Sequence, residues 1–178
     1  GWIFPLLFGA AGATVAVWLV VSYAPETSGS GIPHLKAVLH RLRDLSWTRV
    51  LVVKMMSGVL AIGSGLALGR EGPTVQMGGA VADGLARAMK VSPADRLTLT
   101  AAGAGAGLAA AFNAPLSGLV FVLEEMRRDF RPAVFGAAFL AAASADVVAR
   151  SVSGQLPVFT VPNYAMPSLV ALPVFAVL

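Results

Sequence analysis

The sequence predicts an all-α, polytopic membrane protein with broken, tilted helices. Hydrophobic residues make up 57% of the 178 residues and charged residues only 12%, whereas an ordinary soluble domain carries about 25% charged residues. The mean hydropathy is +0.78. The apolar residues form several long runs that glycines and prolines interrupt, so we expect several membrane-crossing helices in one domain, with lipid as much of the solvent.

The first elements follow from uncharged and apolar runs. Residues 1–25 carry no charge, with Trp2 and Trp18 near the ends, and predict a spanning helix. A signal peptide is disfavoured because the stretch lacks a basic start. Residues 26–33 are rich in Ser and Gly and lead to an amphipathic stretch at 35–43. Residues 45–69 predict a second helix, in which four glycines are expected to allow close helix approach: Gly58, Gly63, Gly65 and Gly69.

The later elements are shorter and interrupted. Gly72 and Pro73 open an apolar helix through Ala86, and Ser92 is a candidate N-cap before Pro93. Residues 97–123 are uncharged, but the run Asn113, Ala114 and Pro115 predicts two helices that meet there. Residues 132–148 and 164–178 are the last candidate helices.

The charge pattern favours a membrane over nucleic acid as partner. The net charge is +4, but the basic residues form two short clusters between apolar runs rather than a stripe with interleaved aromatics. The clusters comprise Lys36, Arg41, Arg43 and Arg49, and then Arg127, Arg128 and Arg131. The positive-inside rule places both on one cytoplasmic face. The chain has no cysteine, so we expect no disulfide or thiol site, and we predict no metal site.

Broken helices in a membrane protein indicate a binding site, because irregular backbone at membrane depth must be buried in protein or line a watery cavity. The N-terminus of a half-helix directs free N–H groups at an anion. Ser30 fits this pattern, since it stands between glycines before a helix-starting proline in the motif Gly29, Ser30, Gly31, Ile32 and Pro33. A simple helix cap is the other reading of this serine.

A second motif, Gly69, Arg70, Glu71, Gly72 and Pro73, places two ionisable groups between apolar segments. Such charges are costly in a membrane and usually functional. The Glu71 carboxylate at a positive helix end would compete with an anion for one position, and protonation of Glu71 would free that position. The alternative is an exposed loop in which Glu71 caps a helix.

Three further charged residues are candidates. Lys54 lies in an apolar run, so it either faces an acidic partner, an anion or water, or snorkels to the interface. Glu124 and Glu125 end an apolar run beside the second basic cluster, where a solvated helix end paired with arginines is also possible. Gly103, Gly105 and Gly107 lack the third glycine and the preceding strand of a nucleotide-binding loop, and they predict tight helix packing.

Three motifs in order resemble the CLC family of chloride channels and chloride/proton antiporters. They are GSGIP at 29–33, GREGPTVQMGG at 69–79 and GLAAAFNAPLSGLVFVLEEM at 107–126. The resemblance implies that these residues belong to the N-terminal half of an inverted-repeat transporter fold, with bound chloride ions as its ligands and no other cofactor. It also implies a transport protein, not an enzyme, in a bacterial-type cell membrane, and a homodimer to whose interface residues 115–123 and 132–149 contribute.

The resemblance also implies residue roles. Residues 29–33 and 69–73 correspond to selectivity-filter segments, with Ser30 touching the central chloride. Glu71 corresponds to the external gating glutamate and Glu125 to the internal proton acceptor, which favours antiport over a passive channel. Lys54 and Glu124 would supply supporting charge.

His34 departs from the family, which usually has Glu there. The family's second half, with a third filter segment and a coordinating tyrosine, is not among these residues. We therefore expect residues 1–178 to be an N-terminal half that does not conduct alone.

Two other function classes remain open. An intramembrane serine hydrolase would use Ser30 with His34 or His40, but three residues past a proline-led helix start is a poor position for the base. A purely structural helix-packing protein explains the glycines and leaves Arg70 and Glu71 unexplained.

Overall fold

The computed structural model describes residues 3–154 and is all-helical in that range. Its helices are α1 Ile3–Tyr23, α2 Ile32–Leu39, α3 Trp47–Gly63, α4 Glu71–Ala88, α5 Pro93–Phe112, α6 Pro115–Phe121 and α7 Pro132–Ser153. A short 3-10 turn, Pro25–Thr27, follows α1, and a π-helical turn, Val122–Arg127, extends α6. The predicted helix at 164–178 lies outside the described residues.

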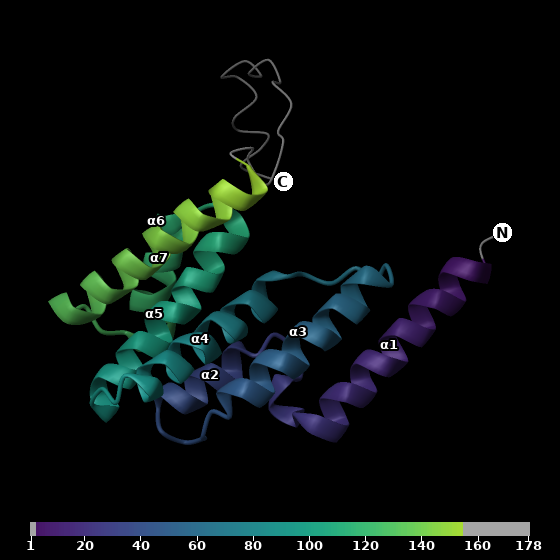
Figure 1. Cartoon of the computed structure of the whole chain (residues 1–178), viewed down its shortest axis with the longest axis horizontal. Coiled ribbons are helices and arrows are strands. Elements are labelled where there is room, and N and C mark those ends of the chain that lie inside the picture. The colour runs from purple at the N-terminus through teal and green to yellow at the C-terminus, as the bar shows by residue number, and fades with distance from the viewer. Residues whose placement is uncertain (1–2, 155–178) are drawn as a thin grey trace, which may run out of the picture.

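The helices form a layered array in which α1 stands at one end and α5, α6 and α7 at the other (Figure 1). α1 packs on α3, α3 on α4 and α4 on α5, while α6 and α7 pack on α5. The short α2 contacts α4, α5 and the π-helical turn. This arrangement brings the loop before α2 to the start of α4, although the two are 40 residues apart in the chain.

Two of the described helices, α1 and α7, are long and apolar enough to cross a membrane. In α1, Ala16 is the buried residue, and large apolar side chains such as Phe4, Leu6 and Trp18 are exposed. A helix that is apolar around its whole circumference suits lipid better than water. The all-α prediction is confirmed for residues 3–154.

The predicted break in the run 97–123 is present. α5 ends at Phe112, Asn113 adopts a left-handed conformation with φ of 52°, and α6 starts at Pro115. The Arg150 guanidinium of α7 donates a hydrogen bond of 3.0 Å to the Asn113 carbonyl, which an unbroken helix would otherwise satisfy. The N-cap prediction also holds, since the Ser92 hydroxyl accepts from the Asp95 N–H at 3.1 Å.

The helix predicted at 45–69 is shorter than expected. α3 ends at Gly63, because Gly65 has a φ of 91° that favours glycine and leaves the helical path. The chain then runs without regular structure to Arg70. Similarly, the amphipathic stretch starts earlier, at Ile32, and its helix ends at Leu39.

The prediction that the glycines in the run 45–69 allow close helix approach is wrong for three of them. Within the described residues nothing lies within 4 Å of a Cβ placed on Gly58, Gly63 or Gly65. The close approaches occur at the α4–α5 and α5–α6 contacts instead, where Gly103, Gly105 and Gly107 meet neighbouring backbone, as expected for tight packing. Because a Cβ there would strike backbone atoms, these glycines fix the distance between the three helices.

Candidate functional site

The first glycine motif, residues 29–33, forms the loop that enters α2. Gly29 and Gly31 have φ angles of 63° and 79°, which other residues rarely adopt. Between them, Ser30 is exposed, and its Oγ accepts a weak hydrogen bond of 3.4 Å from the Ile32 N–H. A hydroxyl oxygen that accepts in this way keeps its own hydrogen for a further partner. The N-cap position of α2 is Gly31, without a side-chain cap, so the Ser30 hydroxyl remains able to donate to a ligand.

The second glycine motif, residues 69–73, leads into α4. Glu71 is the first residue of this helix, and Pro73 occupies the first turn, where a missing N–H costs little. The Glu71 carboxyl group folds back against Gly69, so that a methyl group on Gly69 would clash with it. A side chain at position 69 would therefore displace the Glu71 carboxyl group from this position.

The two motifs touch at Gly72 and Ser30. A Cβ on Gly72 would lie 2.7 Å from the Ser30 Cα and Cβ and 2.8 Å from its carbonyl oxygen, closer than real contacts allow. The starts of α2 and α4 are therefore held side by side. Their first-turn N–H groups lack intrahelical partners, and both positive helix ends favour an anion at this place.

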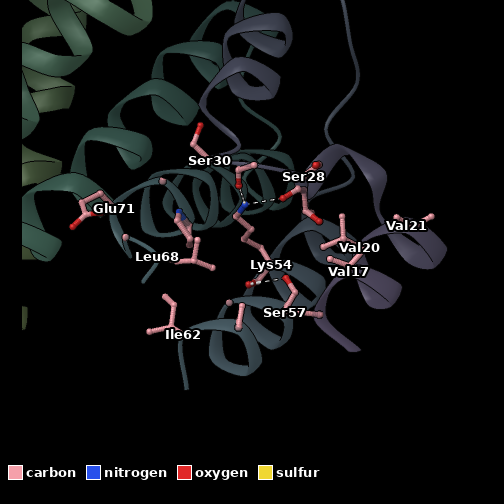
Figure 2. A pocket seen from close by; sticks show the side chains of 18 residues that line it. Val17, Val20, Val21, Ser28, Ser30, Lys54, Ser57, Ile62, Leu68 and Glu71 are labelled. Carbon is pink, nitrogen blue, oxygen red and sulfur yellow. Dashed lines mark hydrogen bonds between the residues drawn. The ribbon is translucent and has the colours of Figure 1, made fainter. Parts of the chain in front are cut away.

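A cavity of about 600 Å³ opens beside this contact, lined by α1, α3 and both motifs. Figure 2 shows Lys54 in its middle, Glu71 on one side and Val17 and Val20 of α1 on the other. Apolar walls next to hydroxyl and backbone donors are typical of small-ligand sites. The described residues hold no cluster of side chains suited to a metal ion.

Lys54 of α3 stabilises the loop that carries the first motif. Its side chain is buried, and its ammonium donates hydrogen bonds of 2.7 Å and 2.6 Å to the carbonyls of Thr27 and Gly29. It does not snorkel to the interface, and among the described residues its partners are carbonyls, not a carboxylate. The ammonium therefore fixes the loop and places a positive charge beneath it.

Arg70 points away from the cavity. Its guanidinium donates a hydrogen bond of 3.0 Å to the Ala111 carbonyl near the end of α5. This contact ties the second motif to α5, so the side chain anchors the loop. The sequence suggested a charge in the anion path, but spacing alone does not give the direction of a long side chain.

Gln76 is a functional candidate that the sequence reasoning missed. It is fully buried under the first motif, against Gly31, and its Nε2 donates to the Glu26 carbonyl at 3.0 Å. The same Nε2 lies 3.3 Å from Nδ1 of His34. His34 thus helps to hold the loop through Gln76. The signal available in the sequence was an amide within an otherwise apolar helix segment.

The predicted internal glutamates lie on the π-helical turn. Glu124 and Glu125 are both exposed, and Glu125 accepts a hydrogen bond from Lys36 of α2, 89 residues earlier in the chain. This ion pair places Lys36 of the first basic cluster beside the turn that leads into the second, and the predicted common cytoplasmic face of the clusters stays a prediction.

The expected arginine partners of Glu125 are engaged elsewhere. Asp129 pairs with Arg131 at 2.7 Å and with Arg127 at 3.8 Å. Hydrogen bonds from Arg131 lower the pKa of Asp129, in the exposed loop before α7, to about 2. Because Asp129 attracts these two arginines, Lys36 is the cation that contacts Glu125 in the described part of the chain.

A serine-hydrolase site is not supported by this geometry. The His34 imidazole contacts Gln76, and the Ser30 hydroxyl contacts the Ile32 N–H. A nucleophilic serine needs a base within hydrogen-bond reach, and among the described contacts of Ser30 none is to a histidine.

Comparison with known proteins gives consistent results. A family model described as voltage gated chloride channel matches residues 12–178. An H⁺/Cl⁻ exchange transporter ClcA from Vibrio vulnificus strain YJ016 is 47% identical over 180 residues, which cover 99% of this chain and 38% of the relative. The ClcA protein of Citrobacter koseri is 42% identical over 163 residues, which cover 90% of this chain and 34% of that protein.

A solved structure agrees as well. The crystal structure of a slow cyanobacterial Cl⁻/H⁺ antiporter matches with a TM-score of 0.88 at 34% identity, covering 99% of this chain and 42% of the antiporter chain. The chain thus spans about two fifths of the length of the relatives it matches. These relatives are integral membrane transport proteins and not enzymes. Since the family model covers nearly the whole sequence and the helices superpose on a solved member, the chain belongs to the CLC family.

Proposed function

We propose that these residues form the N-terminal half of a transport domain that exchanges chloride for protons across a membrane. Chloride would pass the contact between Ser30 and Gly72, and protons would use Glu71 and Glu125. The relatives that match along nearly the whole chain are named as H⁺/Cl⁻ exchangers, which supports exchange over other transport modes.

The observation that carries the proposal is the packing of Gly72 on Ser30. It places a hydroxyl donor and two positive helix ends at one point beside a cavity of about 600 Å³. Chloride is a weakly hydrated anion, and several neutral donors bind it loosely enough for release. Ser30 and the first-turn N–H groups of α2 and α4 supply such donors.

Glu71 is the proposed external gate. Its carboxylate sits at the N-terminus of α4, where the helix dipole also favours an anion. Carboxylate and chloride therefore compete for one position, and proton uptake by Glu71 removes the competitor. Glu125, on the π-helical turn that follows α6 and beside the second basic cluster, is the proposed internal proton acceptor.

Chloride-driven proton movement in liposomes that hold the full-length protein tests this function, with Glu71→Gln and Glu125→Gln beside the parent. We expect the parent to move protons against their gradient when chloride flows down its own, and both variants to lose proton movement. Chloride flux without proton movement in the parent would refute exchange.

A passive, gated chloride channel is the second candidate, because the matching family model is described as that of voltage gated chloride channels. It would use the same Ser30 site and leave Glu125 as a helix-end charge. Planar-bilayer recording distinguishes a channel from an exchanger. The reversal potential of a chloride channel does not depend on the pH gradient, whereas that of a chloride/proton exchanger does. We also propose a homodimer, which cross-linking in native membranes would test.

A further inference from the structure

Lys36 and Glu125 form an ion pair between two elements of the proposed transport path. Lys36 lies on α2, the helix that begins at the Ser30 motif, and Glu125 lies on the π-helical turn after α6. Their side chains are 33% and 48% exposed, so water reaches the pair in the described structure. The contact spans 89 positions and depends on the tertiary fold.

The packing of both elements directs the two side chains at each other. On α2, Leu35, Val38 and Leu39 are buried, and on the π-helical turn Leu123 and Met126 are buried. These apolar faces hold the elements together, and the charged residues project at the rim of that contact. A π-helical turn changes the direction of side chains relative to a regular α-helix, and such turns are common at functional sites.

The other charged groups near Glu125 either interact with it more weakly than Lys36 does or are paired with another residue. Glu124 is its neighbour on the same turn, and Arg128, three residues on, attracts Glu125 without a hydrogen bond. On the other elements that pack against this turn, Arg96 of α5 pairs with Asp83 at 3.4 Å. Arg131, before α7, is bound to Asp129 as described above. Lys36 is therefore the cation that forms both an ion pair and a hydrogen bond with Glu125 among the described residues.

We propose that Lys36 is a positioning residue for internal proton transfer, whose ammonium holds the Glu125 carboxylate ionised and oriented to accept a proton from the cytoplasmic side. This inference rests on the proposed exchange function. A proton from water on the basic face moves to a Glu125 carboxylate oxygen, forms a neutral carboxylic acid and ends the ion pair. Loss of the proton, onward or back, restores the carboxylate and the pair.

The electrostatics agree with this role. The hydrogen bond from Lys36, and then its charge, lower the pKa of the Glu125 carboxyl, which lies beyond the apolar run that ends at Leu123. A lowered pKa keeps the carboxyl group deprotonated down to a more acidic pH and makes a bound proton easy to release. Removing the ammonium raises the pKa, so Glu125 would be protonated up to a higher pH.

The test measures proton flux divided by chloride flux in liposomes with the full-length protein, as a function of the pH on the side of the basic clusters. Dividing by chloride flux corrects for differences in the amount of folded protein. We compare the parent with Lys36→Met, Lys36→Gln and Lys36→Arg. Lys90→Met is the matched control, since it removes a lysine that has no ion pair among the described contacts.

We expect the pH profile of Lys36→Met and of Lys36→Gln to shift toward alkaline pH. Gln can still donate a hydrogen bond, so an equal shift in both variants assigns the effect to the charge. Lys36→Arg keeps the positive charge and should retain the pH profile of the parent, and Lys90→Met should leave that pH profile unchanged.

Two results are negative and distinguishable. A parent that exchanges protons, with an unchanged profile in both neutral Lys36 variants, would overturn the role of Lys36 and leave the exchange function intact. A parent that moves chloride but no protons would overturn the exchange function and, with it, this inference. Infrared titration of the carboxyl band that Glu125→Gln removes provides a second readout, in which the midpoint must rise when the Lys36 charge is lost.

Discussion

Substitution of Gly72 by alanine tests whether the contact between the two motifs makes the anion site. The new methyl group would lie 2.7 Å from two Ser30 carbons, whereas ordinary van der Waals contact begins at 3.4 Å. The two motifs must therefore separate by about 0.7 Å. Overpacking of this kind typically costs about 1–3 kcal/mol, and backbone atoms of Ser30 cannot rotate away as a flexible side chain can.

The expected loss of chloride affinity follows from the donors that move. Separation of Ser30 from the start of α4 removes about one hydrogen bond to a charged ligand, worth roughly 1.5–3 kcal/mol. At about 1.4 kcal/mol for each factor of ten, chloride should bind roughly ten- to a hundredfold more weakly. Isothermal titration calorimetry of chloride with the purified full-length protein measures this directly.

Gly63→Ala provides the matched control. It adds the same methyl group at the end of α3, where nothing in the described structure lies within 4 Å, and it should leave chloride affinity within about twofold of the parent, since surface changes without new contacts have small effects. Parent-like chloride affinity in folded Gly72→Ala would refute the idea that this contact builds the site.

Three further substitutions test the supporting contacts, with thermal unfolding in detergent as the common measurement. Lys54→Met should lower the melting temperature and weaken chloride binding, because two loop carbonyls lose charge-assisted hydrogen bonds worth roughly 1.5–3 kcal/mol each. A parent-like melting temperature together with parent-like chloride affinity would contradict this supporting role of Lys54. Gln76→Leu should destabilise by about 1–3 kcal/mol, because the Glu26 carbonyl loses its donor, and an unchanged melting temperature would show that water replaces the amide. Ser92→Ala should cost about 1 kcal/mol through loss of the α5 N-cap, whereas Ser92→Asp should retain stability; equal melting of both variants would contradict a capping role.

Much of the helical order could be predicted from the sequence because its signals are local. The break at Asn113–Pro115 follows from the missing N–H of a single proline, and the start of α5 from Ser92 and Pro93. The end of α3 was placed six residues late because the run after Gly63 remains apolar. Apolar composition gives no signal for a helix end that depends on the φ angle of Gly65.

The candidate site was less predictable because its contacts are not local. The sequence motifs identified Ser30 and Glu71 as candidates. No hydrophobic periodicity in the sequence predicts that Gly72 contacts Ser30. The Lys36–Glu125 pair was missed for the same reason: both residues were recognised as charges at the basic face, and the pairing across 89 positions depends on how α2 docks. The sequence left Lys54 open to an acidic partner, an anion, water or snorkelling, whereas in the structure the carbonyls of Thr27 and Gly29 accept its hydrogen bonds.

The partners of the nearby cations explain how the site could bind an anion without trapping it. Lys54 donates to the carbonyls of Thr27 and Gly29, and Arg70 donates to the carbonyl of Ala111. Each cation is therefore partly neutralised by peptide dipoles before a ligand arrives. An anion at the motif contact would meet the Ser30 hydroxyl and helix N-termini directly, with the Lys54 charge acting only through the loop. Binding would be favourable enough for entry and weak enough for release, which conduction requires.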